Sequence, residues 1–201
     1  MESTISKRDI LIETGKSKLW IQNNFTDNIY DDFHKLNTVL EVEPPIRTPR
    51  GMGRQRRDIG FFSDESIGYE YSYQIIKSQP LKAQPVLYNL LLKVNKELGT
   101  KFNGILVNRY ENGEKYIGAH GDDENGLDKT KSMVVALSYG AVRNFRIRDA
   151  VTKKIYMDIP TTPCMLLVME GQFQKEFTHE IPPQLKIKDE RISLTFRHHI
   201  K

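Results

Sequence analysis

Hydrophobic side chains recur at helical spacing in the first half of the chain and at alternate positions in the second. Within residues 85–98 the apolar positions form one stripe of a helix: Leu87, Leu90, Leu91, Val94 and Leu98. Pro85 suits the first turn of this helix, and Gly99 suits the position just after its last residue. The pattern therefore predicts a helix over residues 85–98.

An earlier helix is predicted after Thr26, which is a good N-cap. Its apolar positions again have helical spacing: Ile29, Phe33, Leu36 and Leu40. Pro44 and Pro45 end this helix. Residues 18–25, KLWIQNNF, resemble a strand that leads into it, and we expect residues 1–15 to be a loose tail. Residues 69–74, YEYSYQ, alternate like a strand.

After Gly99 the hydrophobic period becomes two and stays so. Seven short runs have the character of strands: GILVNRY, SMVVALSYG, NFRIRD, KIYMDI, CMLLVM, FTHEI and RISLTFR. Two helices followed by many short strands predict an α+β fold, a sandwich or jelly roll whose helices buttress one sheet. The length of 201 residues suits a single domain over residues 1–201.

Composition narrows the class of protein only modestly. A single cysteine, Cys164, excludes an internal disulfide framework and lies in an apolar run that predicts burial. The N-terminus lacks the apolar core of a signal peptide, and no apolar run approaches the length of a membrane span. We expect a soluble intracellular monomer, nuclear in a eukaryote and otherwise cytoplasmic. The net charge of +4 implies little about partners.

The stretch YIGAHGDDE at residues 116–124 places a histidine next to carboxylates. His120 and Asp122 are two residues apart and point to the same face of an extended chain. Of the five histidines, His179 in FTHEIPP is the natural third ligand, because it lies in a distant strand. Two imidazoles and one carboxylate form the facial triad of non-haem iron sites, although zinc sites of this type also exist. A polar turn with a hydrogen-bonded histidine is the simpler alternative.

The last strand, RISLTFR, carries charge on one face only. That face holds Arg191, Ser193, Thr195 and Arg197, and the opposite face is apolar. Arginines inside a β-fold require anions. Asp122 can serve one arginine and a bound dicarboxylate the other. Asn108 and Tyr110, in NRY, share a strand face and add hydrogen-bond donors. A solvent-exposed amphipathic strand is the alternative for this run alone.

Together, N-x-Y, H-x-D, a later histidine and R-x-x-x-T-x-R resemble the AlkB family of Fe(II)- and 2-oxoglutarate-dependent dioxygenases, especially its eukaryotic DNA-repair members. The similarity runs through about residues 45–198. The resemblance implies a double-stranded β-helix that holds Fe(II) through His120, Asp122 and His179, with 2-oxoglutarate and O2 as cosubstrates. It further implies a set of residues around 2-oxoglutarate: Asn108, Tyr110, Arg191 at the distal carboxylate, Ser193, Thr195 and Arg197 at the other end.

The activity that the resemblance implies is oxidative removal of N-methyl groups from 1-methyladenine and 3-methylcytosine, with release of formaldehyde. The substrate would be DNA more readily than RNA, and its base must be flipped or single-stranded. Two rival hypotheses are a 2-oxoglutarate oxygenase that acts on protein or in RNA modification, and a non-catalytic nucleic-acid-binding module.

Residues for the substrate follow from the same resemblance. Tyr69 and Tyr71 align with aromatic residues of the base pocket, although two core tyrosines would give the same pattern. Asp123 and Glu124 either face the exocyclic amine of the base or belong to a turn.

Residues 46–60 form a predicted basic loop that contacts phosphates through its five arginines: Arg47, Arg50, Arg54, Arg56 and Arg57. A merely solvated loop is the alternative. Arg146 and Arg148 are a second candidate phosphate contact. The loop contains no aromatic wedge, only Ile46 and Met52 as bulky apolar side chains, so the preference for single or double strands stays open.

Overall fold

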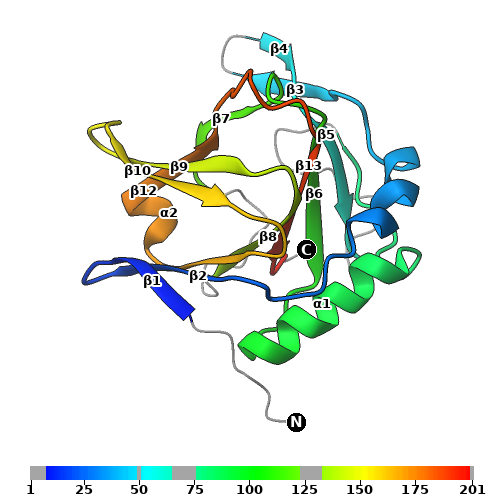
Figure 1. Cartoon of the computed structure of the whole chain (residues 1–201), viewed down its shortest axis with the longest axis horizontal. Helices are drawn as coiled ribbons and strands as arrows, with labels where there is room; N and C mark the ends of the chain where they lie inside the picture. The colour runs from blue at the N-terminus through cyan, green and yellow to red at the C-terminus, as the bar shows by residue number, and fades with distance from the viewer. Residues whose placement is uncertain (1–7, 49–50, 65–75, 123–132, 200–201) are drawn as a thin grey trace.

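Two β-sheets face each other and form the body of the molecule (Figure 1). The computed structural model describes residues 8–48, 51–64, 76–122 and 133–199. The seven-stranded sheet has the order β1 (Arg8–Glu13), β2 (Ser17–Gln22), β11 (Leu166–Gly171), β8 (Val134–Gly140), β13 (Arg191–Arg197), β6 (Gly104–Tyr110) and β5 (Asp58–Phe62). The four-stranded sheet has the order β10 (Ile155–Thr161), β9 (Arg143–Asp149), β12 (Phe177–Ile181) and β7 (Ile117–His120). The paired strands of both sheets run antiparallel, as the predicted jelly roll requires.

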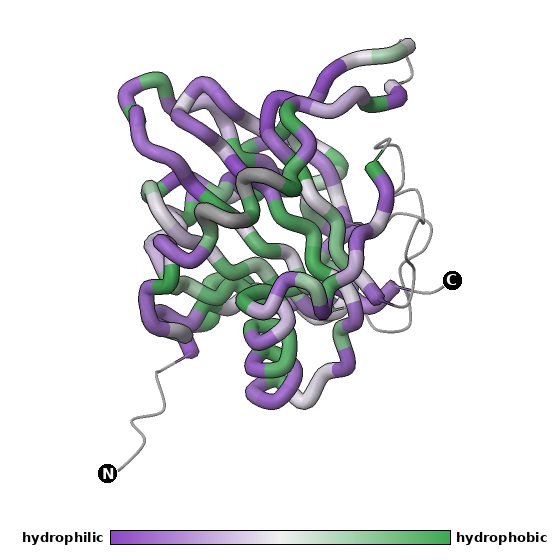
Figure 2. The backbone as a smooth tube through the Cα atoms, turned by 90° about the vertical axis from the view of Figure 1, so that its right-hand side faces the viewer, coloured by the Kyte–Doolittle hydropathy of each residue, from purple (hydrophilic) through white to green (hydrophobic). Residues whose placement is uncertain are grey.

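Helix α1 (Pro85–Leu98) and the residues of the 3-10 helix η1 (Tyr30–Thr38) pack on the outer face of the larger sheet, whereas the short helix α2 (Phe173–Glu176) connects β11 to β12 beside the smaller sheet (Figure 1). Helix α1 has the predicted bounds, and Gly99 ends it with a φ of 65°. Its apolar stripe joins Ile192, Leu194 and Phe196 of β13 in one buried cluster. Figure 2 shows the hydrophobic positions gathered in the central strands. Cys164 is buried, and no helix among the described residues is long and apolar enough to cross a membrane.

Strand β13 lies inside the larger sheet, between β8 and β6, and is buried on both faces. Its apolar face packs under the helices, as predicted, and its other face is directed between the two sheets. The alternative of a solvent-exposed strand is therefore wrong. The two faces of one strand thus separate the main core from an internal polar pocket.

Two predictions for the N-terminal part are wrong. Residues 8–13 are not a loose tail but strand β1, because Ile12 is buried and the Arg8 guanidinium lies 4.7 Å from the Trp20 ring centroid. The first helix is a 3-10 helix, η1 (Tyr30–Thr38), without a side-chain cap. The Thr26 hydroxyl bonds to the Tyr139 hydroxyl at 2.7 Å, so it is not available to cap a helix.

The predicted basic loop over residues 46–60 is also wrong in its structure. Strands β3 (Pro45–Thr48) and β4 (Gly51–Arg54) pair as a separate hairpin, and β5 follows. Gly51 adopts a φ of 111°, which other residues rarely tolerate. The predicted strand over residues 69–74 lies outside the described residues.

Arg143, at the start of β9, connects segments that flank β7 and β12, which are neighbouring strands of the smaller sheet. Its side chain is fully buried and donates to the carbonyl oxygens of Asn112 at 2.9 Å, and of Lys115 and Pro182 at 2.8 Å each. The first two carbonyls precede β7 and the third follows β12. One guanidinium therefore sets the spacing between these segments.

We expect Arg143→Met to lower the free energy of unfolding by about 3 kcal/mol, since three carbonyl oxygens each lose a donor worth roughly 1 kcal/mol. Urea-induced unfolding measures the loss. Arg148→Met is the matched control on the same strand, because Arg148 forms a partly exposed ion pair with Glu180 that is worth about 1 kcal/mol. Equal losses in the two variants would show that the carbonyl oxygens do not depend on Arg143.

Candidate metal and cosubstrate site

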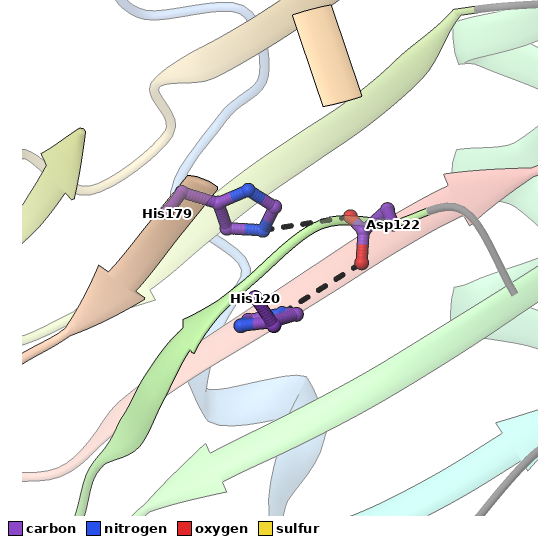
Figure 3. A group of neighbouring side chains, drawn as sticks. All are labelled: His120, Asp122 and His179. Carbon is purple, nitrogen blue, oxygen red and sulfur yellow. Dashed lines mark ion pairs between the residues drawn. The ribbon is translucent and has the colours of Figure 1, made fainter. Parts of the chain in front are cut away.

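Three side chains from two neighbouring strands converge at one point (Figure 3). His120 ends β7, Asp122 follows it, and His179 lies in the middle of β12, directly opposite His120 in the antiparallel register. Nε2 of His120 lies 3.7 Å from Asp122 Oδ1, and Nε2 of His179 lies 3.6 Å from Asp122 Oδ2. One ligand atom from each residue falls within a group 4.8 Å wide. The set suits a divalent transition metal.

Neighbouring groups hold these three residues in a form that can bind a metal. The Nδ1–H of His120 donates to the Gly118 carbonyl at 2.8 Å, which leaves the lone pair on Nε2. Loss of solvent around the ring lowers the pKa of His120 and favours its neutral form. The Asp122 backbone N–H donates to Gln174 Oε1 at 2.9 Å, and Phe145 stacks on His179 at 4.9 Å. A polar turn would need none of these supports.

Arg197 neutralises Asp122 deep inside the pocket. Arg197 Nη2 lies 2.6 Å from Asp122 Oδ1, and both side chains are almost fully buried. The predicted pairing is therefore present. A charge-assisted hydrogen bond of this kind fixes the carboxylate orientation while its Oδ2 stays on the side of His179.

Arg191 carries a buried charge that meets only neutral groups among the described residues. Its Nε donates to Thr161 Oγ1 at 3.2 Å and its Nη2 to Ser138 Oγ at 2.9 Å, while Nη1 has no hydrogen-bond partner there. The Tyr110 ring centroid lies 5.5 Å from the guanidinium. Burial lowers the pKa of Arg191 to about 10, so the group stays charged at neutral pH. A buried cation with an unused donor suits a bound carboxylate.

The remaining predicted cosubstrate residues line the same pocket between the sheets: Asn108, Tyr110, Ser193 and Thr195. The structure thus brings all six of them together with the three candidate ligands.

Arg57 belongs to this pocket, so its prediction as a phosphate contact is wrong. It is buried, donates from Nε to Asn108 Oδ1 at 2.7 Å, and donates from Nη1 to Gln55 Oε1 at 2.5 Å. The bond to Oδ1 orients the Asn108 amide, whose nitrogen then remains to donate elsewhere. Alternation could have revealed this, because Arg57 shares its strand face with the buried Ile59 and Phe61.

The other predicted substrate residues divide into three groups. Arg47, Arg54 and Arg56 are exposed on or beside the β3–β4 hairpin. Arg146 pairs with Asp158 at 2.7 Å and Arg148 with Glu180 at 2.7 Å, so these internal partners disfavour a second phosphate contact. Five residues lie outside the described part of the chain: Arg50, Tyr69, Tyr71, Asp123 and Glu124.

We expect the protein to bind one equivalent of Mn²⁺, and Asp122→Ala or His179→Ala to weaken this binding by more than about 100-fold. A group that only supports a ligand costs roughly 10–100-fold, so a larger loss identifies a ligand itself. Isothermal titration calorimetry measures the affinity, with His198→Ala as the control histidine. Wild-type affinity in His179→Ala would place the metal elsewhere.

Comparison with known proteins agrees with this site. The model of the 2OG-Fe(II) oxygenase superfamily matches residues 20–197. The human alpha-ketoglutarate-dependent dioxygenase alkB homolog 3 is 32% identical over 136 residues, which cover 63% of this chain and 47% of the relative. The human DNA oxidative demethylase ALKBH2 is 31% identical over 137 residues, which cover 65% of this chain and 52% of the relative. The chain therefore spans about half the length of the curated relatives it matches.

The fold is shared with solved structures. The structure of OsALKBH1 aligns with a TM-score of 0.59 at 15% identity and covers 94% of this chain and 100% of that chain. The predicted jelly roll is thereby confirmed, and the family implies Fe(II), 2-oxoglutarate and O2 as its cofactor and cosubstrates. Because the family model matches nearly the whole described body and the curated relatives are AlkB homologues, the chain belongs to the 2OG-Fe(II) oxygenase superfamily, within its AlkB family.

Proposed function

We propose that this protein is an oxidative demethylase of N-alkylated nucleobases, with 1-methyladenine and 3-methylcytosine in DNA as its first candidate substrates and RNA as the second. The observation that carries the proposal is one pocket with a His–Asp–His group beside Arg191, whose Nη1 has no partner among the described residues. The names of two relatives, a dioxygenase and a DNA oxidative demethylase, support the class of substrate.

In this proposal His120, Asp122 and His179 hold Fe(II), which together with 2-oxoglutarate and O2 supplies the oxidation that releases the methyl group as formaldehyde. The protein supplies position and charge. Arg197 orients the Asp122 carboxylate through its 2.6 Å contact. Arg191 binds the distal carboxylate of 2-oxoglutarate, and the nitrogen of Asn108 donates a further hydrogen bond, with its amide oriented by Arg57.

Nucleic acid is the proposed partner because of the cations outside the pocket. Arg47 and Arg54 lie on the β3–β4 hairpin, which stands at one end of the molecule (Figure 1), and Arg56 follows it. None of the three forms an ion pair within the described residues. Phosphate contacts supply most nucleic-acid affinity. The resemblance adds Arg50, and it places Tyr69 and Tyr71 on the base and Asp123 or Glu124 on its exocyclic amine. A base must leave its stack to enter the pocket.

The two rival functions make different demands on the site. A non-catalytic binding module has no use for a buried His–Asp–His group, which disfavours that rival. An oxygenase acting on protein would need the same pocket but not the unpaired arginines around it. The exposed arginines therefore favour nucleic acid.

We expect Arg191→Met to raise KM for 2-oxoglutarate by about 100-fold, because roughly 3 kcal/mol of charge-assisted hydrogen bonding is lost. The KM of Arg191→Lys should fall between those of wild type and Arg191→Met, since lysine keeps the charge but not the forked donor geometry of arginine. Succinate formation against 2-oxoglutarate concentration measures KM, and calorimetric titration of the Mn²⁺-loaded protein checks binding directly. Arg146→Met is the control, and an unchanged KM in Arg191→Met would exclude this arginine as the carboxylate partner.

We expect formaldehyde from methylated oligonucleotides only when Fe(II) and 2-oxoglutarate are both present. The assay compares 1-methyladenine and 3-methylcytosine in single-stranded DNA, duplex DNA and RNA, which ranks the substrates. Asp122→Ala should release at least about 100-fold less, because a ligand carboxylate is removed. Succinate without formaldehyde from every oligonucleotide would reject the nucleic-acid function and favour a protein substrate.

A further inference from the structure

Arg56 and Tyr116 lie side by side where the hairpin segment meets β7. They form an isolated antiparallel bridge, in which the Tyr116 N–H donates to the Arg56 carbonyl at 3.1 Å. Residues directly opposite in such a bridge place their side chains on the same face, with Cβ atoms about 5 Å apart. An aromatic ring and a guanidinium therefore share one small area of surface.

This area borders the pocket from the outside. Arg57 and Ile117, the next residues after Arg56 and Tyr116, both line the pocket. Since successive side chains of extended chain point to opposite faces, Arg56 and Tyr116 point outward at the rim. The candidate ligand His120 is only four residues beyond Tyr116.

Neither side chain forms a hydrogen bond, an ion pair or a ring contact within the described part of the molecule. The Tyr116 side chain forms no ring contact or hydrogen bond with any described residue, and 37% of the residue is exposed. Arg56 is exposed and forms no ion pair there. The nearby carboxylate of Glu43 is bound by Lys115 Nζ at 2.8 Å, which lowers the pKa of Glu43. By contrast, Arg146 and Arg148 are held by carboxylates.

We propose that Tyr116 and Arg56 bind the nucleotide next to the one that enters the pocket, with its base stacked on the Tyr116 ring and its phosphate on the Arg56 guanidinium. This inference rests on the proposed function, because it needs a nucleic-acid substrate. An exposed aromatic ring beside an exposed cation is the arrangement that binds single-stranded nucleic acid without reading its sequence. The pair thus holds the strand while the methylated base lies inside.

The first test compares a methylated single-stranded pentanucleotide with the same methylated base as a free nucleoside. We expect Tyr116→Ala to raise KM for the pentanucleotide by about 10-fold, the size of one base–aromatic stack, and to leave the nucleoside KM and kcat unchanged. Tyr116→Phe should behave as wild type, since it keeps the ring. Tyr156→Ala is the matched control, because Tyr156 is 56% exposed on the distant edge strand β10.

The second test removes the neighbouring base instead of the ring. Two further pentanucleotides carry an abasic site on the 5′ or on the 3′ side of the methylated nucleotide. One of the two should raise the wild-type KM by about 10-fold and leave the KM of Tyr116→Ala unchanged. Arg56→Met should flatten the salt dependence of pentanucleotide binding, measured by fluorescence anisotropy, by about one phosphate contact.

The outcomes separate this inference from the proposed function. If wild type demethylates the pentanucleotide but Tyr116→Ala matches Tyr156→Ala, the platform is absent while the demethylase stands. A nucleoside KM that rises with the pentanucleotide KM would assign Tyr116 a structural role and overturn the platform. If wild type demethylates no oligonucleotide, the proposed function fails, and the nucleotide platform fails with it.

Discussion

The structure depends on how it compensates arginine charges that are buried in a β-fold. Burial of an unpaired charge costs several kcal/mol, so each buried guanidinium must find an anion or a set of dipoles. Arg197 meets the carboxylate of Asp122. Arg143 meets backbone carbonyl oxygens, and Arg191 meets two hydroxyls and the face of Tyr110. Arg191 differs in that its buried Nη1 has no hydrogen-bond partner among the described residues, and the proposed function places an anionic ligand there.

The same strand that carries two of these charges also anchors the fold. On β13 the residues between the arginines and hydroxyls pack into the main core beneath α1. The favourable burial of Ile192, Leu194 and Phe196 therefore offsets the cost of the polar face opposite them. Pocket and core share one backbone, so any shift of β13 would disturb both. This rigidity suits a site that must hold charged groups in fixed geometry.

Sequence patterns predicted the elements whose signals are local and missed those set by tertiary contacts. Pro85 and Gly99 bracket α1, and alternation located the strands that carry His179 and Arg191. The candidate metal group was predictable because the H-x-D spacing brings His120 and Asp122 together at the end of β7, although the register that places His179 opposite His120 is not encoded locally. Strand β1 was missed because its pairing with β2, a tertiary contact, holds these residues in a strand. Thr26 was wrongly predicted to be an N-cap because its hydroxyl forms a hydrogen bond with the Tyr139 hydroxyl instead.

Arg56 and Arg57 show most clearly why a charge cluster cannot be interpreted from composition. They are consecutive, yet Arg57 is buried against Asn108 and Arg56 is exposed beside Tyr116. Alternation along the chain assigns the two charges to opposite sides of the pocket rim. An anionic cosubstrate inside and an anionic strand outside can therefore be bound by neighbouring residues without competing for the same guanidinium. Contacts on either side hold this short segment in place, since Gln55 accepts a hydrogen bond from Arg57 and Asp58 pairs with Arg109.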